Sequence, residues 1–156
     1  MTLMQLKELT PENFAINHPA GRLGKRLTLT VADLMQKAVP TVSPQASWLE
    51  IVSAITQGGM GAVTVIDSNG SLLGLITDGD LRRVFSKLKP ADLETLEATA
   101  VMTKNPITIA PDQLAYDALQ LMENRASQIA VLPVIDAAHQ CLGLIRLHDI
   151  ARSGLL

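Results

Sequence analysis

The sequence predicts a mixed α/β (α+β) fold in which two pseudo-symmetric β-α-β-β-α units pack into one module. Three observations predict it: an internal repeat, a helical stripe of apolar residues in each copy, and paired runs of β-branched residues joined by turns. The chain has 156 residues, of which 47% are apolar. Because a unit of about 60 residues buries little surface by itself, we expect the two copies to share a core.

The repeat is visible when the chain is aligned with itself. At an offset of 67 residues four identities align, which are Met35 with Met102, Lys37 with Lys104, Thr41 with Thr108, and Pro44 with Pro111. After the first helix the offset becomes 69, which aligns Gly74 with Gly143 and Asp80 with Asp149. One small insertion before the second strand explains the change, and matches that extend this far are not expected from chance.

Both copies have the same predicted order of elements. The expected elements are extended segments at 41–42 and 107–109, amphipathic helices at about 47–57 and 113–124, strand pairs at 62–67 with 72–77 and 129–136 with 141–145, and closing helices near 79–87 and 147–153. Asn69-Gly70 is a strong signal for a tight turn between two strands. Residues 89–99 are polar and helix-prone, and we interpret them as the linker between the copies.

Composition narrows the class of partner. The net charge of −2 gives no electrostatic reason to expect nucleic acid or an anionic membrane. Cys141 is the single cysteine, so no disulfide is expected, and His139 and His148 are too isolated to indicate a metal site. The N-terminus lacks an apolar signal segment, and the chain lacks an apolar run long enough to span a membrane. These observations predict a cytoplasmic location.

The frame GLITDGDLRR, residues 74–83, carries a specific family resemblance. A tandem β-α-β-β-α unit, with a G-h-h-T-x-x-D frame opening its last helix (h, apolar), resembles the CBS domain, and the pair resembles a Bateman module. The resemblance covers residues 31 to 156. It implies a first CBS unit at 31–88, a linker at 89–97 and a second unit at 98–156.

The stretch before the repeat resembles a different domain. NFAINHPAGRLGKRL, directly followed by VADLM and the pair, is similar to the end of the sugar-isomerase domain in bacterial arabinose-5-phosphate isomerases, which supply Kdo for lipopolysaccharide. Those enzymes usually carry HPGG here, and Ala20 is the one departure. Residues 1–30 are therefore expected to be a remnant of that domain plus a linker; the alternative is a solvated linker with no further role.

His18 matches a position that contributes to the isomerase site in that family. Isomerisation needs a positioned base, a proton shuttle and a phosphate anchor, and no such groups surround His18 in this sequence. We therefore expect no isomerase activity from this chain, which has the character of a regulatory fragment. Its expected partners are an N-terminal isomerase domain absent from this sequence and a small-molecule effector.

The resemblance implies a nucleotide or nucleotide sugar between the units, with no other cofactor required. The frame would set Thr77 near phosphate or sugar and Asp80 and Asp149 on ribose, with Asp78 and His148 beside them. Helix capping by Thr77 or Asp78, with Asp80 in the first helical turn, is the alternative, and both roles can hold together.

Arg146 occupies the position of Thr77 in the second frame. A guanidinium suits a phosphate or carboxylate, which points to a ligand with an extra acidic group. CMP-Kdo, the activated end product of the pathway, fits that description and is the expected effector. The alternatives are that Arg146 faces solvent or pairs with Asp149 at an empty site, that the pair senses adenine nucleotides, or that it only mediates oligomerisation.

The walls of the two clefts are assigned by analogy with the family. One cleft is expected to use Val39, Pro40, Thr41, Ala62 and Val63, and the other Asn105, Pro106, Ile107, Ser127, Gln128 and Ile129. Each of these residues also fits a core or turn position. CBS pairs commonly associate again through their helices, and the apolar stripes around Ile51 and Leu119 predict a homodimer or homo-tetramer.

Overall fold

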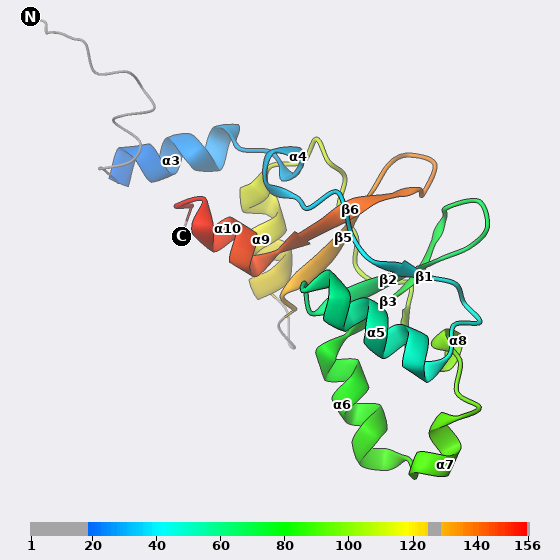
Figure 1. Cartoon of the computed structure of the whole chain (residues 1–156). Helices are drawn as coiled ribbons and strands as arrows, with labels where there is room; N and C mark the ends of the chain where they lie inside the picture. The colour runs from blue at the N-terminus through cyan, green and yellow to red at the C-terminus, as the bar shows by residue number, and fades with distance from the viewer. Residues whose placement is uncertain (1–18, 125–128, 156) are drawn as a thin grey trace, which may run out of the picture.

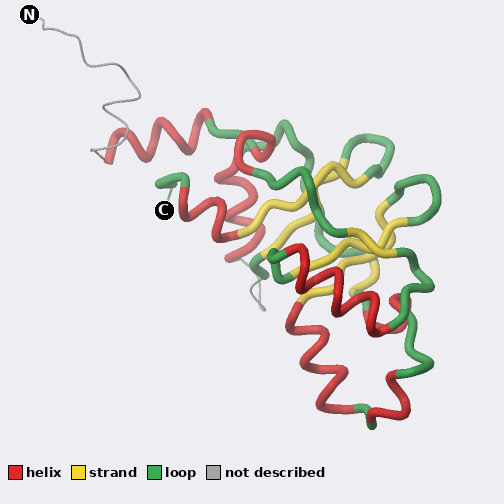
Figure 2. The backbone as a smooth tube through the Cα atoms, in the orientation of Figure 1, coloured by secondary structure: helices red, strands yellow, loops and turns green. Residues whose placement is uncertain are grey.

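A computed structural model describes residues 19–124 and 129–155 of the chain (Figure 1). In chain order its elements are α3 (Pro19–Thr28), α4 (Val31–Leu34), β1 (Thr41–Val42), α5 (Trp48–Gly58), β2 (Ala62–Ile66), β3 (Leu72–Thr77), α6 (Asp78–Lys87), α7 (Pro90–Leu93), α8 (Ala98–Val101), β4 (Thr103–Lys104), α9 (Ala115–Glu123), β5 (Val131–Ile135), β6 (Cys141–Arg146) and α10 (Leu147–Arg152). The predicted mixed α+β class is confirmed. Figure 2 shows the strands in the middle and helices at both ends.

Each copy builds a sheet around an antiparallel hairpin. In the first copy the strand order is β1-β2-β3-β4, with β1 parallel to β2 and the other neighbours antiparallel. In the second copy β5 and β6 form a two-stranded sheet. The extended segment predicted at 107–109 contributes one parallel bridge, between Ile109 and Val134, in place of a full strand. The hairpins carry matching irregularities after Val65 and Val134.

The two predicted amphipathic helices are confirmed. Ser47 and Glu50 form a capping box at the start of α5, and the left-handed Gly59 ends the helix at φ 66°. Its inward face buries Ile51 and Ile55 against the first sheet. The corresponding face of α9 buries Ala115, Ala118, Leu119 and Met122, which is the predicted stripe.

Two short helices that the sequence analysis did not predict, α4 and α8, exchange places between the copies (Figure 1). Val31 on α4 is fully buried in the core of the second copy, and Ala98 on α8 is fully buried in the core of the first. The Val31 amide donates to the Gln113 carbonyl at 2.8 Å, and the Ala98 amide donates to the Ala46 carbonyl at 3.0 Å. The two donors, Val31 and Ala98, are one repeat period apart, and so are the two acceptors, Ala46 and Gln113. The exchange is therefore pseudo-symmetric.

After each exchanged helix the chain pairs with the edge of the opposite copy's sheet at the first glycine of the frame. Gln36 and Leu144 exchange backbone hydrogen bonds of 2.7 and 3.0 Å. At the equivalent place β4 pairs with β3, so that Lys104 lies opposite Gly74. A Cβ atom on Gly74 would lie 2.9 Å from the Thr103 carbonyl oxygen, and one on Gly143 would collide with the Gln36 carbonyl. Glycine opens both frames because a second backbone approaches there.

A third, smaller core joins the two sheets. Ala62, Leu75 and Leu144 are buried together, with Val39, Met60 and Val131 packed around them. The two hairpin turns also lie side by side, because Ser71 and Gln140 form a bridge between them (Figure 1). The two copies therefore share one continuous module.

Replacing Gly143 with alanine tests the close approach. We expect Gly143→Ala to lower the free energy of unfolding by about 3 kcal/mol, because the Cβ atom forces the 36–37 backbone off the sheet. Gly24→Ala is the matched control, since a Cβ there meets nothing within 4 Å and α3 gains a better helix former. Urea unfolding of both variants measures the effect, and equal stabilities would contradict it.

Truncating Val31 tests the exchange of α4. We expect Val31→Ala to cost about 2 kcal/mol of unfolding free energy through lost burial and a residual cavity in the core of the second copy. Leu27→Ala should change stability by less than about 0.5 kcal/mol, because the Leu27 side chain is 65% exposed. Thermal and urea melts provide the comparison, and a neutral Val31→Ala variant would disprove the packing.

Candidate functional site

The first frame opens onto a cavity of about 670 Å³ that both copies build, which we call the first cleft. One side is the junction of β3 and α6, and the other is the chain that follows β4 together with the start of β5. Its lining residues are Gly61, Leu75, Thr77, Asp78, Gly79, Asp80, Arg82, Arg83, Thr103, Pro106, Ile107, Ile129, Ala130 and Val131.

Thr77 and Asp80 form a capping box at the start of α6. Asp80 Oδ2 accepts from the Thr77 amide at 2.9 Å and from the Thr77 hydroxyl at 3.1 Å, and the Asp80 amide donates to Thr77 Oγ1 at 3.3 Å. The predicted capping role is confirmed. The cap also holds the carboxylate rigidly at the edge of the cleft with its side chain only 8% exposed.

Two arginines bring positive charge to this edge. Arg83 Nη2 donates to Asp80 Oδ1, and the Arg83 side chain is 65% exposed. Arg82 also lines the cleft and makes no ion pair within 19–124 and 129–155. Together with the positive end of α6, these guanidinium groups favour an anion, whereas the Asp80 carboxylate favours hydroxyl donors. The edge can therefore accommodate a ligand that carries both kinds of group.

The opposite wall of the cleft is largely apolar. Pro106, Ile107 and Ile129 are half-buried and face the same cavity. Asn105, just before them, has a positive φ of 49°, which turns the chain out of β4. A flat apolar group fits against such a wall.

In the second frame, the aspartate is paired with an arginine of the same frame, and we call this frame closed for that reason. Arg146 Nε donates to Asp149 Oδ2 at 3.1 Å and Arg146 Nη2 donates to Asp149 Oδ1 at 2.9 Å, while the Gln36 side-chain amide donates to the same Oδ1 at 3.1 Å. Burial opposes ionisation of Asp149, but the hydrogen bonds from Arg146 and Gln36 outweigh it and lower its pKa. The same hydrogen bond raises the pKa of Arg146. This is the alternative in which Arg146 pairs with Asp149.

The remaining predicted site residues are dispersed. Val63 is fully buried in the core of the first copy, and Ala62 is fully buried between the sheets, so neither presents a surface to a ligand. Val39 packs on that central core, the Pro40 carbonyl accepts from the Thr64 amide, and Thr41 pairs with Thr64 in β1. None of these five residues lines the first cleft.

Other predicted residues have simpler positions. Asp78 is exposed at the rim of the first cleft, and His148 is exposed on α10. Ser127, Gln128 and His18 lie outside the described residues. Eight residues line the cleft that were not predicted from the sequence: Gly61, Leu75, Gly79, Arg82, Arg83, Thr103, Ala130 and Val131. The spacing of Arg83, three residues after Asp80 on a helix, is the signal that could have found it.

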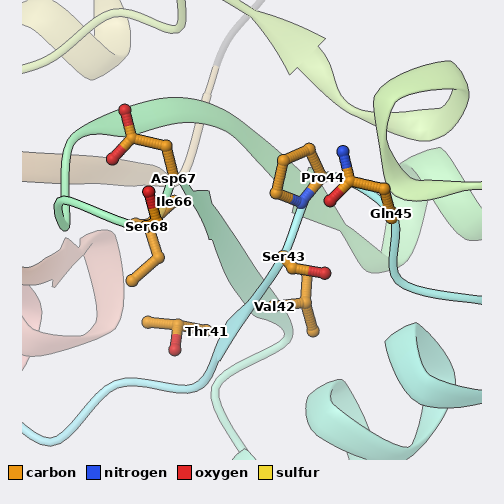
Figure 3. A pocket seen from close by; sticks show the side chains of 8 residues that line it. All are labelled: Thr41, Val42, Ser43, Pro44, Gln45, Ile66, Asp67 and Ser68. Atoms are coloured by element: carbon orange, nitrogen blue, oxygen red, sulfur yellow. The ribbon is translucent and has the colours of Figure 1, made fainter.

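A second hollow, of about 550 Å³, lies beside β1 and the end of β2 (Figure 3). Figure 3 shows that its polar side chains do not converge on one point. Its carboxylate, Asp67, is used within the hairpin turn, where Oδ1 accepts from the amides of Asn69 at 2.8 Å and Ser71 at 3.0 Å. Since no cationic side chain lines it, it is a weaker ligand site than the first cleft.

In the described part of the chain, no group of three or more His, Cys, Asp or Glu side chains is arranged to hold a metal ion. None of the described helices is both long and apolar enough to cross a membrane.

The duplicated unit, the exchanged helices and the G-h-h-T-x-x-D frame define a tandem pair of CBS-type units. The chain belongs to the CBS domain family, whose sequence profile matches residues 31–87 and 98–155. Solved CBS proteins share the fold: CBSX2 from Arabidopsis thaliana, in complex with AMP, has a TM-score of 0.71 at 24% identity and covers 81% of this chain and 96% of its own. ATU1752 from Agrobacterium tumefaciens has a TM-score of 0.71 at 25% identity, covering 80% and 92%.

The chain is also similar to curated arabinose 5-phosphate isomerases. The arabinose 5-phosphate isomerase KdsD of Yersinia pestis is 39% identical over 100% of this chain, and KpsF of Escherichia coli O6:H1 is 37% identical over 96%. The matched regions are 47% and 44% of those proteins, so the chain spans about half the length of these relatives. It is a CBS pair related to the C-terminal part of such isomerases.

Acidification tests the closed second frame. Because the pKa of Asp149 is lowered on folding, its contribution to stability is present above about pH 4, the ordinary range of an aspartate, and is lost as the pH falls further. We expect Asp149→Asn to cost about 1–2 kcal/mol at pH 7 and progressively less below pH 4. Urea melts from pH 7 to pH 2 measure this, with Asp112→Asn, an exposed carboxylate, as control. A pH-independent difference would contradict the ion pair.

Proposed function

We propose that this CBS pair binds a nucleotide or nucleotide sugar in the first cleft and so regulates an isomerase domain carried by the full-length protein. One observation carries the proposal: a buried carboxylate, two arginines and an apolar wall meet in one cavity of about 670 Å³. Pockets of roughly 300–1,000 Å³ are typical for small ligands. The activity that we propose is regulated is the one named for the related proteins, arabinose 5-phosphate isomerisation.

The binding mode follows from the chemistry of the two walls. The ribose diol donates to the Asp80 carboxylate, which accepts in the manner of the acidic residue in dinucleotide folds. The base lies against Pro106, Ile107 and Ile129, and the anionic groups lie beside Arg82 and Arg83. Thr77 keeps its capping role and holds Asp80 in place.

CMP-Kdo is the first candidate ligand. It carries a phosphate and a sugar carboxylate, and the cleft offers two arginines at one edge. Arg82 and Arg83 take the role that the sequence analysis gave to Arg146, because Arg146 is held by Asp149. Adenine nucleotides are the second candidate, since CBSX2 has been solved with AMP, and the CBS pair of MJ0100 with 5′-methylthioadenosine and S-adenosylmethionine.

One ligand per chain is part of the proposal. At the second frame Asp149 already accepts from both Arg146 and Gln36, so a ribose would have to displace two internal donors. The pair thus keeps one sensing cleft and one internally closed frame.

We also propose how copies of the chain associate. Trp48, Leu81 and Phe85 line an apolar hollow of about 610 Å³ on the outer faces of α5 and α6, and we propose that this face mediates a homodimer. Further pairing of such dimers would give the tetramer. Cys141 is a free thiol, which suits the reducing cytoplasm.

A ligand titration tests the proposed function. We expect CMP-Kdo, or failing that AMP, to raise the melting temperature, because a ligand at a hundred times its Kd adds about 2.7 kcal/mol to the folded state. Asp80→Asn keeps an acceptor for the cap and should weaken binding at least about tenfold. Asp149→Asn should leave it unchanged, with a stoichiometry of one by calorimetry.

Arabinose 5-phosphate, which lacks a base, serves as the negative control. Two results would contradict the proposal. The absence of a melting-temperature shift with CMP-Kdo, AMP and ATP would favour the oligomerisation role alone. Loss of binding in Asp149→Asn, with Asp80→Asn unaffected, would move the site to the second frame.

A further inference from the structure

Asp80 is already occupied in the cleft described above. Its Oδ2 accepts from the amide and hydroxyl of Thr77, at 2.9 and 3.1 Å. Its Oδ1 accepts from Arg83 and from no other group in residues 19–124 and 129–155. A carboxylate offers about four acceptor sites, and three of them are already in use. Both hydroxyls of a ribose can therefore donate to Asp80 only if Arg83 gives up its site on Oδ1.

We propose that Arg83 is an internal competitor that makes the cleft selective for anionic nucleotides over neutral nucleosides. This inference rests on the proposed function and adds a specificity determinant to it. A nucleoside that takes Oδ1 strands the Arg83 guanidinium without a counter-charge. A nucleotide that brings a phosphate to the same edge offers Arg83 a new partner as it releases the old one. Binding of the anion and exposure of the carboxylate are thereby coupled.

The burial of the two partners makes this exchange feasible. The Asp80 side chain is 8% exposed and fixed by the cap, whereas the Arg83 side chain is 65% exposed. An ion pair with one partner in solvent is weakly held, so moving the arginine costs little. The carboxylate stays in place and the guanidinium moves, as a competitor must.

The second copy provides an internal comparison. Arg152 is the repeat equivalent of Arg83, yet Asp149 pairs with Arg146, which lies at the capping position. Arg146 is only 20% exposed, and Gln36 adds a second donor. The counter-ion there is built into the cap and cannot leave easily. In the first copy it stands one helical turn away, on the solvent side.

Arg82 separates this role from simple charge attraction. It lines the same cleft with the same charge, but it makes no ion pair with Asp80. Arg82→Ala therefore removes one positive charge without freeing Asp80. Arg83→Ala removes the same charge and also frees Oδ1.

The experiment compares two matched ligand pairs, adenosine with AMP and cytidine with CMP, by calorimetry on wild type, Arg83→Ala and Arg82→Ala. In Arg83→Ala we expect nucleoside affinity to rise about two- to fivefold, because the competing pair is gone. The preference for nucleotide over nucleoside should fall about tenfold. In Arg82→Ala nucleotide affinity should fall while nucleoside affinity stays unchanged. A thermal melt of each variant checks that it is folded.

The outcomes separate this inference from the proposed function. If wild type binds a nucleotide and Arg83→Ala leaves the nucleoside affinity unchanged or lowers it, the competitor role is wrong and the nucleotide site stands. If Arg82→Ala and Arg83→Ala behave alike, Arg83 contributes only charge, which also overturns the inference. If wild type binds none of the four ligands and no CMP-Kdo, the nucleotide site itself is refuted.

Discussion

The exchange of α4 and α8 is the interaction on which the rest of the structure depends. Each unit is too small to close a core with its own residues, and each completes it with a short helix from the other end of the repeat, through Val31 in one case and Ala98 in the other. The backbone bonds that hold the two helices repeat with the sequence period. The units therefore fold as partners, and separating them would open both cores at once.

The exchange also creates the cleft. Because α8 lies in the first core, the chain that leaves it pairs with the edge of the first sheet at Gly74, as β4, before it enters the second unit. The chain after β4 then places Pro106 and Ile107 in the same cavity as Thr77 and Asp80, which open α6. A ligand held there touches both units, so its binding would report on their relative position. The regulation that we propose would follow from this geometry if the ligand prefers one of two arrangements of the units.

The two frames share one sequence pattern but differ in the position of the arginine that pairs with the aspartate. In the second frame the arginine sits at the capping position, and together with Gln36 it satisfies Asp149 within the chain. In the first frame threonine caps the helix, and the arginine is on the outer surface. The residue at the capping position thus decides whether the aspartate pairs with an arginine of the cap or with an arginine on the outer surface of the helix.

The sequence by itself determined the class of fold, the repeat, the amphipathic helices, the hairpins and helix capping at Thr77 or Asp78 with Asp80 in the first helical turn. These depend on period, turn chemistry and contacts a few residues apart, all of which are local. Only the tertiary structure decided that α4 and α8 change places, that Val63 is a core residue, and that Pro106 faces Asp80 while Arg146 turns onto Asp149. Residues 31–34 and 98–101 are too short to show a helical period, and their partners lie far away in the chain. The exchange decides which chain segment lies opposite each frame, because it directs the path of the chain between the two units.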